Sequence, residues 1–360
     1  MISRPLTVVL IVPTGVGASI GGFAGDALPV ARAIGQVSDT LITHPNVLNG
    51  AQLYWPIPNA LYVEGYALDK FAQGCWGLQP VHQNRIGLIL DSGIEPDLQL
   101  RHLQAVDAAR ATLGLNITDY VLTDRPLNVE LRMSESGASW GTIANPDSLL
   151  RAAEKLITQA KVEAIAVVAR FPDDEGSLAL ANYRHGTGVD PLAGAEAVIS
   201  HLIVRTFKIP CAHAPALSPL PLDPHLSPRS AAEEIGYTFL SCVLAGLGKA
   251  PQFTVQKAQE NSQLSITADR VDAVVIPATA CGGSAILSLS GRSTVQIIAV
   301  GDNKTQMQAT PEKLGIKALQ VNSYLEAIGV LVALRTGISP DSLSADISPL
   351  RYLSNSTKQI

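Results

Sequence analysis

Residues 13–26 read Pro13-Thr14-Gly15-Val16-Gly17-Ala18-Ser19-Ile20-Gly21-Gly22-Phe23-Ala24-Gly25-Asp26. They follow an apolar run at 7–12, which predicts a strand, and they precede a helix-like run at 27–34. A strand, a glycine loop and a helix in this order point backbone N–H groups and a helix N-terminus at an anion. The sequence therefore predicts a phosphate or carboxylate site formed by Gly15, Gly17, Gly21, Gly22 and Asp26.

The loop departs from the known phosphate-binding fingerprints. The dinucleotide pattern G-x-G-x-x-G lacks its third glycine, because Ile20 stands where that glycine is required. The P-loop pattern is absent too, since neither its spacing nor its lysine is present. Glycines also gather where backbone segments pack closely or turn sharply. An anion site and close packing are therefore both open interpretations of this loop.

The composition indicates a large core and little surface charge. The chain has 360 residues, of which 47% are hydrophobic, 16% charged and 5% aromatic. This length is enough for one large or two ordinary domains, and aliphatic packing is typical of parallel sheets covered by helices. The formal charge of −5, without a lysine or arginine run, argues against a nucleic-acid partner. Low charge with a mean hydropathy of +0.22 predicts a homo-oligomer.

Location is predicted from apolar runs, the first residues and the cysteines. The longest apolar stretches, at 164–169 and 271–276, are strand-sized, so we expect no membrane span. Residues 1–5 lead directly into the first strand and show no signal-peptide cleavage pattern. The four cysteines form no C-x-x-C pair and are interpreted as reduced thiols. We therefore expect a cytoplasmic protein.

Strand-like and helix-like runs alternate along the chain. The expected strands are at 7–12, 40–43, 60–63, 85–90, 119–122, 164–169, 271–276, 295–300 and 318–321. The expected helices include 97–113, 147–160, 191–207, 230–247 and 323–335. This alternation predicts an α/β fold with a mostly parallel sheet, Rossmann-like strand–loop–helix units and two lobes.

The domain organisation is predicted from two irregular segments. Residues 123–146 form a polar excursion with a hairpin, and residues 208–229, with six prolines, form a loop or linker. We expect an N-terminal α/β lobe at 1–125 with the glycine loop and a middle segment at 126–225. A C-terminal α/β part follows at 226–360.

Polar residues also gather after other predicted strands. In a parallel sheet these strand ends line one edge, where ligands bind. His44 follows one strand as a candidate general acid or base, or as a helix cap. Asp91 follows another and suits metal or hydroxyl binding, or a helix cap. Further ligand-binding candidates near these strands are Asn46, Asn49 and Glu64.

The middle of the chain offers further candidates. Three acidic residues at 173–175 suit Mg²⁺ bridging to a phosphate, or a solvated loop. Arg184 and His185 could meet an anionic substrate, with His185 as a catalytic candidate, and Asp190 is the expected N-cap of the next helix. A zinc site is a weak alternative, because its candidate ligands lack a fourth partner at a recognisable spacing. These ligands are His201, Cys211 and His213.

A second glycine cradle follows the strand at 271–276. Cys281 stands at an expected helix N-terminus, a position that lowers a thiol pKa, so it is the best nucleophile candidate, with small core filler as the alternative. The remaining ligand-binding candidates of this cradle are Thr279, Gly282, Gly283 and Ser284. The next strand ends in Asp302, Asn303 and Lys304, and Lys304 could neutralise a phosphate or carboxylate.

Six segments together carry a family resemblance. They are 21–29, 43–50, 62–66, 90–95, 188–191 and 280–283. With them the chain, over nearly its whole length, resembles an uncharacterised family of cyanobacteria and plastids that carries a domain-of-unknown-function label. The resemblance implies the cytoplasm or stroma of a phototroph. It assigns no reaction and no catalytic residue.

Three functions compete on these residues. The first is an enzyme acting on a small phosphorylated or carboxylated metabolite, and the second is a non-catalytic ligand sensor with the same pocket. The third is an assembly or scaffold factor whose low charge reflects partner surfaces. The polar strand ends favour the first two, and only Cys281 and His44 offer chemically competent groups for catalysis.

Overall fold

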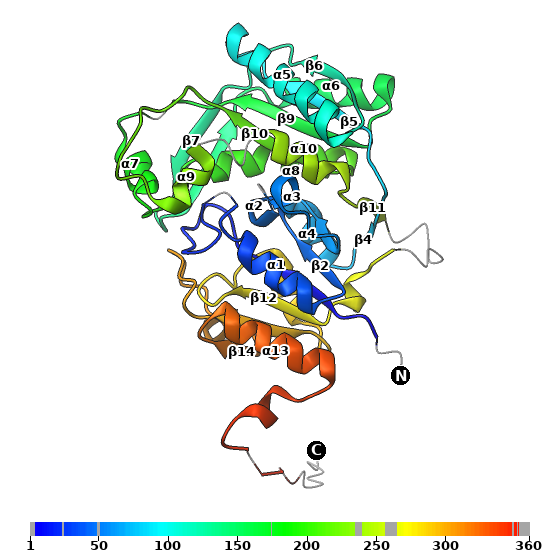
Figure 1. Cartoon of the computed structure of the whole chain (residues 1–360), viewed down its shortest axis with the longest axis vertical. Helices are drawn as coiled ribbons and strands as arrows, with labels where there is room; N and C mark the ends of the chain where they lie inside the picture. Colours follow the sequence, from blue (N-terminus) through cyan, green and yellow to red (C-terminus); the bar gives the residue numbers. More distant parts are fainter. Residues whose placement is uncertain are drawn as a thin grey trace, which may run out of the picture.

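The computed structural model describes residues 4–23, 25–48, 51–173, 175–234, 240–255, 265–347, 349–350 and 352. Figure 1 shows two lobes, each built on a parallel sheet. Asn49 and the acidic residue at 174, both named above as candidates, lie outside the described residues.

In the described part of the chain, six parallel strands form the large sheet. They are β1 (Thr7–Leu10), β2 (Thr40–Thr43), β3 (Ala60–Tyr62), β12 (Ala273–Pro277), β13 (Gln296–Val300) and β14 (Ala318–Val321). Their order is β14-β13-β12-β1-β2-β3. Numbered along the chain within this sheet, that is 3-2-1-4-5-6, the order of dinucleotide-binding Rossmann sheets. The first and the last parts of the chain therefore share one sheet.

Four parallel strands form the small sheet within the described residues. They are β5 (Ile86–Leu90), β6 (Ile117–Leu122), β9 (Ala164–Arg170) and β10 (Cys211–Ala216), in the order β10-β9-β5-β6. Two antiparallel pairs accompany the sheets, β4 (Trp76–Gln79) with β11 (Gln252–Val255) and β7 (Val129–Met133) with β8 (Ser139–Ile143). Strands β7 and β8 confirm the hairpin predicted within 123–146.

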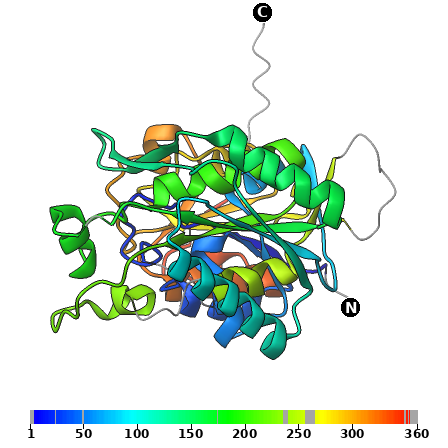
Figure 2. The ribbon, with the colours of Figure 1, turned by 90° about the horizontal axis from the view of Figure 1, so that it is seen from above.

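Helices cover both faces of the sheets. Figure 2 shows helices on the two sides of the small sheet. The main helices are α1 (Leu28–Val37), α4 (Gly65–Ala72), α5 (Pro96–Leu113), α6 (Pro146–Lys155), α8 (Ala193–Phe207), α10 (Leu240–Gly248), α11 (Ser284–Ser290) and α13 (Tyr324–Thr336). The shorter ones are α2 (Pro45–Leu48), α3 (Ala51–Tyr54), α7 (Leu178–Arg184), α9 (Pro228–Glu234) and α12 (Pro311–Leu314), with a π-helical end of α6 at Leu156–Ala160 and 3₁₀ turns at Ala268–Arg270 and Pro340–Leu343.

Local sequence sets the ends of these helices. Ser323 caps α13 by accepting the backbone N–H of Glu326, and the helix ends at Gly337 with φ +73°. Glu64 caps α4 by accepting the N–H groups of Tyr66 and Ala67. Such caps satisfy backbone groups that the first turn of a helix leaves unpaired, and glycine accepts positive φ without strain.

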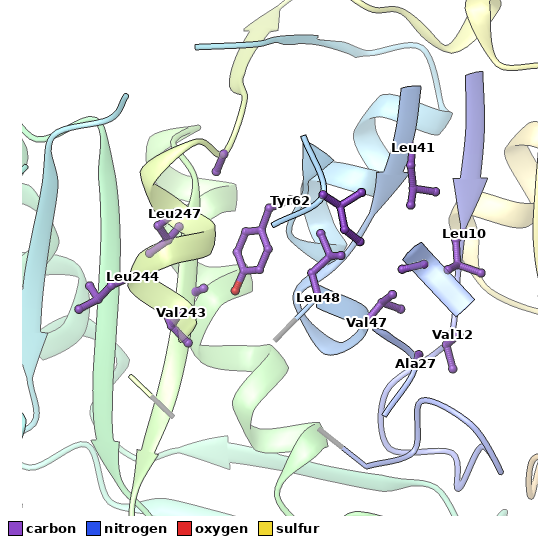
Figure 3. Close-up of a cluster of buried hydrophobic side chains, with 14 of the residues drawn as sticks. Leu10, Val12, Ala27, Leu41, Val47, Leu48, Tyr62, Val243, Leu244 and Leu247 are labelled. Atoms are coloured by element: carbon purple, nitrogen blue, oxygen red, sulfur yellow. The ribbon is translucent and has the colours of Figure 1, made fainter. Parts of the chain in front are cut away.

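The two lobes share a continuous apolar core. One cluster of buried side chains contains Leu10 of the large sheet, Leu88 of the small sheet and Leu244 of α10. Figure 3 shows the ring of Tyr62 between α10 on one side and Leu48 on the other. A Cβ on Gly246 would lie 2.7 Å from that ring, so this helix approaches Tyr62 at a residue without a side chain. The lobes are therefore packed together as one body rather than tethered by a linker.

All nine predicted strands are present, with ends shifted by at most two residues. Strand β10 was not predicted, because its sequence was interpreted as a proline-rich loop. Prolines are tolerated there because β10 is an edge strand of the small sheet. The helix predicted at 230–247 is described in two parts, α9 (Pro228–Glu234) and α10 (Leu240–Gly248), and residues 235–239 between them lie outside the described residues.

Candidate functional site

The glycine loop lies at the point where the large sheet reverses its direction of winding. It follows β1, and the neighbouring strand β12 leads to α11. Helix α1 packs in one apolar cluster and α11 in the other, so the two connections cover different sets of buried side chains. In open α/β sheets, ligands bind in the crevice outside the strand ends at such a switch point. The fold thus places the loop where a ligand is expected.

The first half of the loop has the backbone of an anion-binding concavity. Gly15 and Gly17 have φ of +69° and +64°, whereas Val16 between them does not have a positive φ. Alternating backbone handedness of this kind forms nests, in which successive N–H groups face one anion. Within the described residues, no acceptor is bonded to the N–H groups of 14–18. These donors are available to a ligand.

The second half of the loop is held by the protein itself. The N–H of Ser19 donates to the carbonyl of Lys304 at 2.9 Å, and the N–H of Ile20 donates to Asn303 Oδ1 at 2.8 Å. Asn303 is fully buried and donates in turn to the carbonyl of Ile20 and to Tyr324. Gly21 and Gly22 therefore belong to a packed turn, so the close-packing interpretation holds for this half of the loop.

Asp26 closes the loop and links it to the other lobe. Its Oδ1 accepts the N–H of Gly21 at 2.5 Å, and its Oδ2 pairs with Arg229 of α9 at 2.6 Å. The Asp26 side chain is 6% exposed and that of Arg229 is 44% exposed. Burial raises the pKa of Asp26, although the Arg229 guanidinium and the Gly21 N–H offset part of that shift. Figure 1 shows α9 next to the blue glycine loop.

Three further segments adjoin the free half of the loop. Gln306 donates its N–H to the carbonyl of Val16 at 2.8 Å, and Ser139 of β8 donates to the carbonyl of Gly15 at 2.9 Å. A Cβ on Gly17 would lie 2.9 Å from the carbonyl oxygen of Gly188. Lys304 is exposed, and no described group pairs with its ammonium. Both lobes thus contribute contacts to the loop, and the backbone of Lys304, which carries an exposed side chain, is one of them.

The second glycine cradle lies at the same edge of the large sheet. Ala309 donates its N–H to the carbonyl of Thr279, and the hydroxyls of Thr279 and Thr305 are 2.8 Å apart. The segment 302–309 therefore contacts both residues 279–281 and the glycine loop. In the rest of the cradle, a Cβ on Gly282 would meet Ala309 at 3.2 Å, and one on Gly283 would make an ordinary contact with Ile286 at 4.0 Å. The Ser284 hydroxyl accepts a hydrogen bond from Gln73.

Cys281 does not have the predicted thiolate character. Its side chain is fully buried, and its Sγ lies 3.7 Å from the carbonyl of Pro277. Burial raises the pKa of this thiol to about 11, with a smaller contribution from the charge of Glu312. The expected lowering of the pKa is therefore wrong, because this thiol is buried and desolvation is the main cause of its raised pKa.

His44 connects the ends of β1 and β2. Its Nε2 accepts the N–H of Val12 at 3.0 Å, and burial lowers its pKa to about 4. The imidazole is therefore neutral at physiological pH and is used as a buried hydrogen-bond acceptor. Asn46 donates to the carbonyl of Gly21 at 2.6 Å and so supports the packed turn.

Asp91 lies at the other switch point, in the small sheet. It is fully buried and accepts N–H groups from Gly93, Leu127 and Arg170 at 2.9, 2.9 and 3.1 Å. An open hollow of about 310 Å³ adjoins it. The guanidinium of Arg170, which lines this hollow, forms ion pairs with Glu95 and Asp173. Asp91 thus joins three backbone segments of the small lobe, away from the glycine loop.

The remaining candidates form ion pairs within the second lobe. Arg184 pairs with Glu234 at 2.6 Å, and His185 Nε2 lies 3.0 Å from Asp223. Asp190 is not the helix N-cap, because α8 begins after Leu192; its Oδ1 instead accepts the N–H of Leu192.

The candidate zinc ligands have protein partners instead of a common centre. His201 Nε2 lies 2.9 Å from Glu64, whose side chain is 4% exposed. His213 Nδ1 contacts the Ser200 hydroxyl at 3.2 Å, and Cys211 is buried with its Sγ near a backbone carbonyl. Within the described ranges, no group of three histidine, cysteine or acidic side chains is placed to hold a metal ion.

His201 and Glu64 form a polar contact between α8 and α4. Burial would lower the pKa of His201, but the hydrogen bond to Glu64 and the charges of Glu64 and Asp69 outweigh it and raise that pKa. A Cβ on Gly65 would lie 3.0 Å from His201 Nε2, so the ring sits directly against the start of α4.

Three residues at the glycine loop were not predicted from sequence. They are Ser139, Arg229 and Gln306, which reach the loop from β8, α9 and the segment after β13. None belongs to a pattern that names a ligand, and each lies more than 100 residues from the loop. Only the tertiary arrangement brings them there.

This architecture defines an α/β protein with a Rossmann-ordered sheet and a glycine loop at its switch point. Residues 7–344 match the family model described as "Protein of unknown function (DUF3326)", so the chain belongs to this family. The chain is 59% identical over 359 residues, covering 100% of itself and 99% of its relative, to a protein from Synechococcus sp. described as an uncharacterized lipoprotein. The predicted family resemblance is thus confirmed. No solved structure matches the chain. No helix in the described residues is long and apolar enough to span a membrane.

Proposed function

We propose that this protein binds a small metabolite through a phosphate or carboxylate group at the glycine loop. The observation that carries the proposal is the run of unbonded N–H groups at 14–18, with alternating backbone handedness, at the switch point of the large sheet. The backbone of Lys304 contacts the loop, and its exposed side chain would add a charge-assisted contact if it turned toward the ligand.

The same site would serve an enzyme or a ligand sensor. The two candidate catalytic groups, Cys281 and His44, are both buried. At neutral pH the Cys281 thiol keeps its proton and the His44 imidazole is uncharged. This favours reversible binding over covalent catalysis by these groups. Action on a phosphorylated or carboxylated metabolite stays the wider hypothesis, with a scaffold function as a further alternative.

Two measurements test the proposal. Native mass spectrometry of protein purified without added ligand should reveal a bound anionic metabolite. Titration with inorganic phosphate by calorimetry should give saturable binding that Gly17→Ala abolishes, because the new Cβ would meet Gly188 at 2.9 Å and deform the loop. Lys304→Ala should weaken binding by about tenfold or more, the equivalent of about 1.4 kcal/mol.

Matched controls separate the site from general effects. Gly315 also has positive φ, +67°, but nothing lies within 4 Å of its Cβ position, so Gly315→Ala carries the same backbone strain elsewhere. Lys317 is likewise an exposed lysine. Both control variants should bind phosphate like the wild type. Equal loss in Gly17→Ala and Gly315→Ala, or no saturable binding in the wild type, would refute the proposal.

Location and assembly are further parts of the proposal. We propose that this protein lies in the cytoplasm or stroma of a phototroph, as the family resemblance implies, and that it forms a homo-oligomer, on the strength of its low charge. The lipoprotein description of the Synechococcus relative makes membrane attachment the competing expectation. Cell fractionation with an antibody to the chain decides the location, and light scattering during size-exclusion chromatography decides the subunit number. Recovery in the membrane fraction would refute the first part.

A further inference from the structure

The other lobe places an arginine at the end of the glycine loop. Arg229 of α9 is within 2.6 Å of Asp26, and Asp26 in turn accepts the N–H of Gly21 inside the loop. A second contact fixes this neighbourhood, since the rings of Phe23 and Tyr183 lie 4.9 Å apart. Helices α7 and α9 therefore pack against the end of the loop, and α9 places a guanidinium at Asp26.

The two partners of this ion pair differ in their surroundings. Asp26 is almost wholly buried at the loop, whereas nearly half of the Arg229 side chain is open to solvent. An arginine side chain has several rotatable bonds and a planar fork of donors that fits phosphate. Arg229 can thus change partners, while Asp26 cannot leave its place.

Asp26 itself is unsuited to contact an anionic ligand. A carboxylate beside a phosphate repels it, and like charges are costly where burial lowers the dielectric constant. Asp26 was predicted as a ligand-binding residue, but both of its oxygens are occupied, one by Gly21 and one by Arg229. Its position instead makes it a competitor for the cation that the ligand would use.

We infer that Arg229 is a ligand-binding residue for a phosphate group at the glycine loop, and that it forms an ion pair with Asp26 while no phosphate is bound. The inference rests on the proposed function. Binding of the phosphate would draw the Arg229 guanidinium from Asp26 to the phosphate oxygens. The free energy of the Asp26–Arg229 pair would then be subtracted from the affinity, so Asp26 sets how tightly the phosphate is held.

A thermodynamic cycle with inorganic phosphate as the probe tests this exchange. Arg229→Ala should weaken phosphate binding at least tenfold, and Arg229→Lys should fall between that variant and the wild type, because it keeps the charge and loses the fork. Asp26→Asn should strengthen binding about tenfold, because it removes the competitor. In the Arg229→Ala background, Asp26→Asn should strengthen binding much less than it does in the wild type, because only the repulsion between the carboxylate and the phosphate is then removed. Arg101 of α5 is exposed, so Arg101→Ala controls for the change in net charge and should bind normally.

The outcomes separate the two proposals. Absence of phosphate binding by the wild type overturns the proposed function and the exchange with it. Phosphate binding that Arg229→Ala leaves unchanged overturns the exchange alone. Asp26→Asn that strengthens binding equally with and without Arg229 also overturns it, because simple charge repulsion would then explain the effect. If Asp26→Asn fails to fold, the comparison of Arg229→Ala, Arg229→Lys and Arg101→Ala still decides.

Discussion

Acidification should destabilise this protein through His44. The imidazole is buried and its pKa is lowered from 6.5 to about 4, so between these values the unfolded chain binds a proton that the folded chain does not. Stability then falls as the pH falls from about 6.5 towards 4. The full difference of about 2.5 pKa units corresponds to about 3.4 kcal/mol, and by pH 5 about 2 kcal/mol of it would be lost.

The test compares the wild type with His44→Gln. The glutamine keeps an oxygen that can accept the Val12 N–H but has no titrating group. Urea unfolding, followed by tryptophan fluorescence at pH 7.5 and pH 5, gives the free energy of unfolding of each protein. Other groups titrate in both proteins, so the difference between the two isolates His44. That difference should shift by about 2 kcal/mol in favour of the variant at pH 5.

An exposed histidine supplies the control. His225→Gln makes the same substitution at a ring that lies at the surface, and it controls for the change of residue type. The assignment of His44 as a buried neutral acceptor would be refuted by one result. In that result, the wild type and His44→Gln differ in free energy of unfolding by the same amount at both pH values, within about 0.5 kcal/mol.

Three further outcomes follow from burial and contact. Gly246→Ala should lower the free energy of unfolding by about 1–3 kcal/mol, because its Cβ would lie 2.7 Å from the ring of Tyr62, and an unchanged urea midpoint would contradict this. Iodoacetamide at pH 7.5 should modify the exposed Cys75 and spare the buried Cys281, as peptide mass spectrometry will show; equal rates would contradict the burial. His201→Gln should cost more stability at pH 5.5 than at pH 8.5, by less than about 1 kcal/mol for a half-exposed ring, because a raised pKa gives stability that is lost as the pH rises through it. A larger loss at pH 8.5 in thermal unfolding would reverse that sign and refute it.

The sequence alone determined the strands and the class of fold. Strands such as β9 are buried along almost their whole length, so they appear as unbroken apolar runs that no surface strand would show. The glycine loop was predictable for a similar reason, since glycine adopts the positive φ seen at Gly15 and Gly17 without the steric cost that residues with a side chain incur. Both signals are local, because they concern what one residue or one short run can do.

Tertiary structure decided which strands form one sheet and which backbone groups of the glycine loop remain without a hydrogen-bond partner among the described residues. β12 pairs with β1 across more than 250 residues, so the first and last parts of the chain complete one sheet although the sequence separates them. Whether an N–H group in the glycine loop is bonded depends on contacts with distant segments. Asn303 accepts the N–H of Ile20, whereas no described group accepts the N–H groups of 14–18. Burial, which no local pattern records, raises the pKa of Cys281 and lowers that of His44. Propensity and backbone sterics act within a few residues, whereas desolvation and hydrogen bonding depend on whatever the fold brings into contact.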